Sequence, residues 1–225
     1  MKNRATKWAN EIFLRSMYGI SMRHVGARED KKLIDTLFRR IVDEYSVPSR
    51  YYHGLPHIVG GVRILHDLPF LAVDTQVAIL AYIYHDIVCV PGAKENEERS
   101  AEWAARDLFA LGVSLHLADK VRSTIMATKH TGGLKAQDDK IVADVDIVGL
   151  GAPWDEYALN GNLIRREYLE HGYTLGALNA GRKKFLESML ARLRIYYLNY
   201  FYHKYEDRAR ENLARDLKEL EGLGR

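Results

Sequence analysis

The segment that decides the fold is Ala78-Ile79-Leu80-Ala81-Tyr82-Ile83-Tyr84-His85-Asp86, which lies in the most apolar part of the chain. We interpret it as a buried helix that ends in the adjacent His85 and Asp86. An imidazole and a carboxylate at the end of a buried helix cost free energy unless they are paired or bind a metal. The alternative is a capping Asp beside an ordinary His, and the dipeptide alone favours that alternative.

The rest of the chain also has a helical period. Between residues 30 and 45 the apolar positions recur every three or four residues, which is typical of one helix face: Ile34, Leu37, Phe38, Ile41 and Tyr45. Asn96 is predicted as a helix N-cap, Gly112 as a helix stop and Ser114 as the start of the next helix. Long alternations typical of strands are absent. We therefore predict one all-α domain over residues 1–225, with nine to eleven helices.

Composition limits the functional classes. Of 225 residues, 33 are Lys or Arg and 30 are Asp or Glu, so the net charge of +3 argues against a protein that coats nucleic acid. The single Cys89 excludes an internal disulfide framework and a Cys-rich zinc module. Residues 1–18 lack the apolar run of a signal peptide. We expect a soluble, cytoplasmic protein with no membrane partner and no duplex nucleic acid partner.

A second polar feature lies in the apolar run Ile141-Val142-Ala143-Asp144-Val145-Asp146-Ile147-Val148-Gly149-Leu150-Gly151. Buried unpaired carboxylates are costly, so Asp144 and Asp146 both need partners. His57, His85 and Asp86 are candidate partners for these two carboxylates. The alternative is a pair of Asp residues that cap the start of a helix.

Taken in order, these residues resemble the HD superfamily of metal-dependent phosphohydrolases, in which a His is followed by His-Asp at a helix end and by a distant Asp. The resemblance is closer to a bacterial group of predicted HD-type phosphohydrolases and covers about residues 45–215. It rests on these pieces: Tyr52-His53 through His57, Tyr84-His85-Asp86, Asn96-Glu97-Glu98-Arg99-Ser100-Ala101, Ala127-Thr128-Lys129-His130, Asp144-Val145-Asp146, Ile164-Arg165-Arg166-Glu167-Tyr168, Gly181-Arg182 and Ala209-Arg210-Glu211-Asn212-Leu213.

The resemblance implies an HD-type helical bundle with a metal site between central helices. It implies that His57, His85, Asp86 and Asp146 are the ligands, with Asp144 as a supporting or proton-handling group. We expect one divalent ion, Mn, Fe, Co, Ni, Zn or Mg, which lowers the pKa of bound water and polarises a phosphoryl group. A second metal near His130 is the alternative.

Phosphate esters are anionic, so cationic donors are expected beside the metal. We predict catalytic roles for Asp86, Asp144, Lys129 and Glu97, and substrate contacts for Arg50, His53, Lys129, His130 and Arg165. A solvated surface charge is the alternative for each cation, Arg166 included. For Glu97 and Glu98 the alternative is capping of the helix start.

The predicted function is hydrolysis of a nucleotide or another small phosphate ester by metal-activated water. Three alternatives stay open: a phosphodiesterase on cyclic or oligonucleotide substrates, a non-catalytic nucleotide-sensing HD protein, and a structural helical protein. The aromatic run from Tyr196 to Tyr205 predicts core packing or a subunit interface, so a homodimer is compatible with the sequence.

Overall fold

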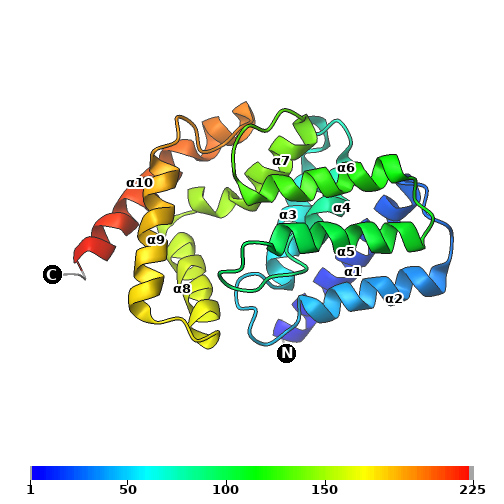
Figure 1. The fold of residues 1–225 in the computed structure, drawn as a ribbon, viewed down its shortest axis with the longest axis horizontal. Helices are drawn as coiled ribbons and strands as arrows, with labels where there is room; N and C mark the ends of the chain where they lie inside the picture. The colour runs from blue at the N-terminus through cyan, green and yellow to red at the C-terminus, as the bar shows by residue number, and fades with distance from the viewer. Residues whose placement is uncertain (1, 223–225) are drawn as a thin grey trace. The chain divides into compact units, whose positions relative to one another are not determined.

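The computed structural model describes residues 2–222, with side chains from Trp8 onward. Over these residues the chain is all-α, as predicted, with ten α-helices, three short 3₁₀ helices and no strand (Figure 1). The elements are α1 (Lys2–His24), α2 (Lys31–Glu44), α3 (Leu55–Asp67), η1 (Pro69–Leu71), α4 (Thr75–Tyr84), α5 (Asn96–Ala110), α6 (Leu115–Met126), η2 (Ala127–Lys129), α7 (Gln137–Asp146), η3 (Val148–Gly151), α8 (Trp154–Glu170), α9 (Leu175–Leu190) and α10 (Asn199–Gly222).

The chain forms two compact units, the first ending at Val145 and the second beginning at Asp146. The single domain predicted over residues 1–225 therefore stays a prediction. Met1 and residues 223–225, which that prediction includes, lie outside the described residues. None of the described helices combines the length and the apolar character needed to cross a membrane.

Helix α4 is the centre of the first unit. It packs against α1, α3, α5 and α6, and every residue from Val77 to Tyr84 is buried. A helix covered on all sides has no polar face, which explains why this segment is apolar throughout instead of amphipathic. Asp74 caps its start by accepting a hydrogen bond from the backbone N–H of Val77 at 3.1 Å.

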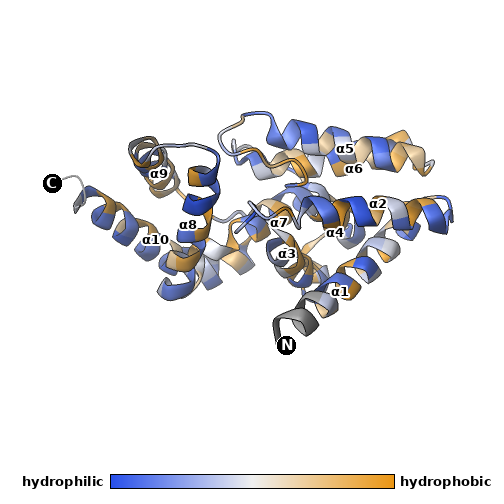
Figure 2. Cartoon of the chain, turned by 90° about the horizontal axis from the view of Figure 1, so that it is seen from below, coloured by the Kyte–Doolittle hydropathy of each residue, from blue (hydrophilic) through white to orange (hydrophobic). Residues whose placement is uncertain are grey.

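Most of the predicted helix boundaries are confirmed. Helix α2 buries Leu37, Phe38 and Ile41 and exposes its polar positions, and Figure 2 shows hydrophilic and hydrophobic segments alternating along it. Gly112 follows α5 with a φ of 74°, the left-handed conformation that favours glycine after a helix. Ser114 caps α6 through the N–H of Leu117.

The prediction of Asn96 as an N-cap is wrong. Its side-chain amide donates to the carbonyl of Val90 at 2.9 Å, and its oxygen accepts from the N–H of Val90 at 3.1 Å. Glu95 occupies the N-cap position of α5 instead. The Asn96 side chain thus stabilises the loop before the helix, because its amide nitrogen and its oxygen both hydrogen-bond the backbone of Val90.

The second unit packs α10 against η3 and α9. Gly151 is required here, because a Cβ at this position would lie 2.6 Å from the Cβ of Tyr205. Tyr196 and Phe201 are fully buried, so these members of the aromatic run are core residues. The side chain of Asn212 donates to the carbonyls of Leu150 and Ala152, at 2.8 and 2.9 Å, and ties α10 to η3 and the residue that follows it.

Candidate metal centre

Four side chains that are far apart in the sequence converge at one point. His57, His85, Asp86 and Asp146 each offer one ligand atom, and these atoms all lie within 4.8 Å of one another. His57 is on α3, His85 and Asp86 directly follow α4, and Asp146 is the last residue of α7. The helix that carries Asp146 belongs, up to Val145, to the first unit.

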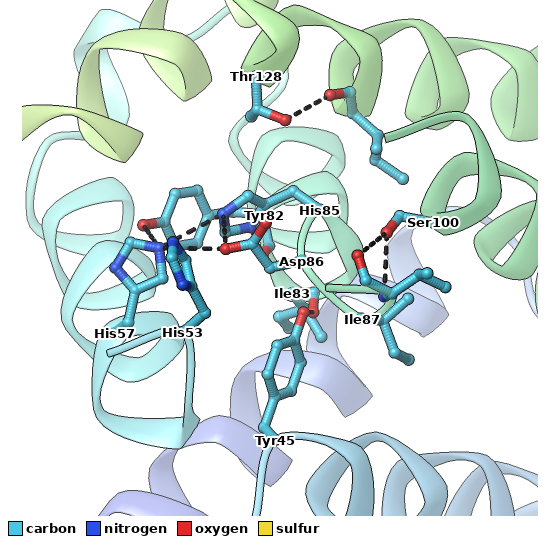
Figure 3. Close-up of polar contacts among 12 residues, drawn as sticks. Tyr45, His53, His57, Tyr82, Ile83, His85, Asp86, Ile87, Ser100 and Thr128 are labelled. Atoms are coloured by element: carbon cyan, nitrogen blue, oxygen red, sulfur yellow. Dashed lines mark hydrogen bonds and ion pairs between the residues drawn. The ribbon is translucent and has the colours of Figure 1, made fainter. Parts of the chain in front are cut away.

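The imidazoles are close enough to share an ion. The Nε2 atoms of His57 and His85 are 3.4 Å apart, and Oδ2 of Asp86 lies 3.2 Å from His85 Nε2 and 3.7 Å from His57 Nε2 (Figure 3). Ligand atoms bound to one first-row metal at about 2.1 Å lie roughly 3 to 4 Å apart. The observed separations fit that requirement with small side-chain adjustments.

The backbone sets the tautomer of His85. Its Nδ1 lies 2.7 Å from the carbonyl oxygen of Tyr82, which can only accept, so Nδ1 carries the proton. In the neutral ring Nε2 is then left with a lone pair directed at His57 and Asp86. Metal-binding histidines in proteins are commonly oriented by a hydrogen bond of this kind. Because His85 is 1% exposed, water does not compete for that hydrogen bond.

Tyr82 also contacts the other imidazole. Its hydroxyl lies 3.3 Å from Nε2 of His57, and its ring centroid is 4.4 Å from that of His85. The Tyr82 ring fits against α3 only because residue 61 is Gly, since a Cβ there would overlap the ring. One tyrosine therefore touches both histidines of the cluster.

Helix α7 is fixed at its opposite end by a buried carboxylate. Oδ1 of Asp138 accepts from the N–H groups of Val73 and Asp74 at 2.7 and 3.1 Å, and Lys120 lies 3.1 Å from Oδ2. These contacts tie the first turn of α7 to the start of α4. They help to set where Asp146, at the far end of α7, is placed.

Asp144 and Asp146, the two aspartates of the apolar run from Ile141 to Gly151, have different surroundings in the structure. Asp144 is fully buried, whereas Asp146 is partly exposed and belongs to the cluster. Residues two apart on a helix point about 200° away from each other, so both cannot face the same ion. The predicted choice of Asp146 as the ligand agrees with this geometry, and the supporting role of Asp144 stays a prediction.

Glu97 on α5 is close enough to Asp86 for their charges to interact, and Lys129 on η2 is close enough to interact with Glu97. Burial raises the pKa of Glu97, and the charge of Asp86 acts in the same direction while Lys129 opposes it. Lys129 hydrogen-bonds Glu98 and donates to the carbonyl of Lys94 at 2.9 Å. The hydrogen bond between Lys129 and Glu98 lowers the pKa of Glu98 and raises the pKa of Lys129.

The predicted substrate contacts have different surroundings. The ring centroids of His53 and His57 are 6.0 Å apart, so His53 lies at the cluster. Arg50 donates to the backbone carbonyls of Asp86 and Ile87. His130 directly follows η2 in the left-handed conformation, with a φ of 54°. Arg165 is on α8 of the second unit, and its contact with substrate stays a prediction.

Sequence reasoning missed Tyr82 and Gly61. Tyr82 was read only as part of the apolar helix, yet its position three residues before His85 places its carbonyl within reach of the imidazole. The sequence around Gly61 does not indicate that the ring of Tyr82 packs against this glycine. Five other histidines, in contrast, lie outside the cluster and are all exposed: His24, His66, His116, His171 and His203.

The donor set suits a divalent transition metal. Two imidazole nitrogens and two carboxylate oxygens are ligands that such ions accept, and the two imidazole nitrogens distinguish the site from one built for calcium. The cluster could therefore hold one metal ion, whose identity the ligands do not select. Comparison of the chain with protein-family models, curated proteins and solved structures found no match.

Proposed function

We propose that the protein is a metal-dependent phosphohydrolase of the HD type that acts on a nucleotide or another small phosphate ester. The observation that carries the proposal is the convergence of His57, His85, Asp86 and Asp146 within 4.8 Å. The ordered resemblance over residues 45–215 supports the same activity, because it includes all four residues.

The roles of the residues follow from their surroundings. His57, His85, Asp86 and Asp146 hold the ion, which when bound polarises a phosphoryl oxygen and increases the acidity of water. Glu97, whose pKa is raised by burial, is the general acid that we assign to the leaving-group oxygen. His53, beside His57, contacts the phosphate ester at the edge of the site.

Metal analysis of the purified protein, followed by phosphate release from a panel of nucleotides, tests the proposal. We expect about one divalent ion per chain and turnover of at least one nucleotide monophosphate or small phosphate ester. Bound metal without turnover would contradict the hydrolase and favour a nucleotide-sensing protein. A chain that takes up none of the first-row ions would contradict the metal centre itself.

A further inference from the structure

We infer that Arg50 is a positioning residue that joins the two chain segments carrying the metal ligands. It was predicted as a contact to the substrate phosphate, and its surroundings favour a different role. The inference rests on the proposed metal centre and deepens it, because it names the group that fixes Asp86 relative to His57.

The contacts of Arg50 are with the backbone of both segments. Its Nη1 donates to the carbonyl of Asp86 at 2.6 Å, and its Nη2 donates to the carbonyl of Ile87 at 2.7 Å. Nη1 also lies 3.4 Å from the carbonyl of His53, four residues before His57. The guanidinium thus bridges the turn that follows α4 and the turn that precedes α3.

The guanidinium is itself held in place. Its central carbon lies 5.2 Å from the ring centroid of Tyr45, and the hydroxyl of Tyr45 donates to the carbonyl of Ile83 at 2.8 Å. Figure 3 shows Tyr45 directed at Ile83, close to Asp86. The backbone N–H of Leu55 donates to the carbonyl of Tyr45, so the same residue also contacts the start of α3. Arg50 is therefore part of a packed connection, half-buried, between α3 and α4.

The chemistry of the side chain fits this role. A guanidinium is a rigid planar fork that can donate to two carbonyls at once, whereas a lysine ammonium is a point charge without that geometry. Both terminal nitrogens of Arg50 are directed at carbonyl oxygens. The positive charge also lies beyond the C-terminal end of α4, where a cation is stabilised.

The test is a Co²⁺ titration of wild type and Arg50→Lys without substrate, followed by visible absorption, because that spectrum reports the ligand geometry. Partners outside the ligand set typically change metal affinity about 10- to 100-fold. We expect Arg50→Lys to weaken Co²⁺ binding within that range and to change the spectrum of the bound ion. Arg50→Gln, which keeps planar N–H donors without the charge, is expected to change both readouts in the same direction.

Arg63→Lys is the matched control. Arg63 is on α3, like His57, and its guanidinium packs 4.3 Å from the ring centroid of Phe13. This variant is expected to bind Co²⁺ like wild type with the same spectrum. Circular dichroism checks that the helices persist in all three variants.

The outcomes separate the inference from the function on which it rests. If Arg50→Lys binds Co²⁺ with the affinity and the visible spectrum of wild type, the positioning role is wrong. If Arg63→Lys changes the spectrum as much as Arg50→Lys does, the effect is not specific and the inference also fails. If wild type binds no Co²⁺, the proposed metal centre falls, and the inference falls with it.

Discussion

At the scale of single residues, Asp144 and Asp146, the last two of the four aspartates of α7, offer the sharpest test of the ligand set. Asp146 belongs to the cluster, whereas Asp144 is fully buried on another side of the helix. We predict that Asp146→Asn weakens metal binding more than about 100-fold, beyond the range typical of residues outside the ligand set. Asp144→Asn is predicted to weaken binding less, within that range, because Asp144 is expected to support the ligands and not to bind the ion itself.

Isothermal titration with Zn²⁺ or Mn²⁺ measures both affinities directly. Asp144→Asn is the matched control, since it makes the same chemical change two residues away. A loss of affinity confined to Asp144→Asn would reverse the assignment of the ligand and contradict the geometry.

Two adjacent glycines on α3 make a second prediction at this scale. A Cβ at Gly61 would overlap the ring of Tyr82, whereas a Cβ at Gly60 meets nothing within 4 Å. Gly61→Ala is predicted to destabilise the protein by about 1–3 kcal/mol through overpacking and to weaken metal binding by displacing Tyr82 from His57. Gly60→Ala is predicted to stabilise it by about 0.5–1 kcal/mol, because alanine favours a helix.

Urea unfolding and metal titration of the two variants check these opposite signs. The contrast isolates the Tyr82 contact, because both substitutions add one methyl group to the same helix. Equal stability and equal metal affinity in the two variants would show that the Tyr82 ring is not held as described.

At the scale of elements, one buried carboxylate connects four helices of the first unit. Asp107 on α5 accepts a hydrogen bond from the hydroxyl of Tyr84 on α4 at 3.1 Å and lies 3.6 Å from Arg40 on α2. Tyr84 in turn lies 3.1 Å from the hydroxyl of Tyr18 on α1. Burial raises the pKa of Asp107, although Tyr84 and Arg40 both act to lower it.

This raised pKa gives the stability a pH dependence of known sign. The folded state binds the Asp107 proton more tightly than the unfolded state, so the stability it contributes is present below the unfolded pKa of about 4. That contribution is lost as the pH rises through the higher folded pKa. We predict that the free energy of unfolding of wild type, relative to Asp107→Asn, is greater at pH 4 than at pH 7.

Urea titrations of both proteins at these two pH values measure the difference between them. Because the other titrating groups are shared, they cancel in this comparison. A relative stability that stays constant, or that increases toward pH 7, would contradict a raised pKa for Asp107.

An element could be predicted from the sequence where neighbouring residues determine it, and could not where contacts with distant residues determine it. The face of α2 was predictable because burial on one side of a helix leaves a period of three to four residues. The role of Asn96 was not, because its amide can cap a helix or bind a loop carbonyl, and only the path of residues 90–95 decides between them. The same limit applies to Arg50, whose acceptors are backbone carbonyls of residues 36 and 37 positions away.

At the scale of the whole molecule, the candidate site was more predictable than its supports. The four candidate ligand residues were predictable because they match an ordered pattern of residue types in the sequence. The group that orients His85 is the backbone carbonyl of Tyr82, and every residue has such a carbonyl, so the sequence does not mark it. The space that Gly61 leaves for the Tyr82 ring is likewise not marked by any residue type. Such features exist only once α3 and α4 are packed together.

A metal ion bound at the candidate centre would also stabilise the folded chain. A ligand that binds only the folded state stabilises it by RT ln(1 + [L]/Kd), or about 2.7 kcal/mol at a hundredfold excess over Kd. For a chain of this size each kcal/mol corresponds to roughly 2–4 °C in Tm. We therefore predict that a saturating divalent ion raises the Tm of wild type by about 5–10 °C relative to the protein in a chelator. The prediction joins the local geometry of the ligands to a property of the entire fold.

His85→Ala is predicted to lose most of this shift while it keeps the helical circular dichroism, because α4 ends before residue 85. His116→Ala is the control, since His116 is exposed on α6 and lies outside the cluster. It should show the same rise in Tm as wild type. A rise of equal size in His85→Ala would place the bound ion elsewhere on the molecule. Differential scanning calorimetry of the three proteins, with and without the ion, distinguishes these outcomes. Each variant differs from wild type by one histidine only, so a difference in the Tm shift is due to that side chain.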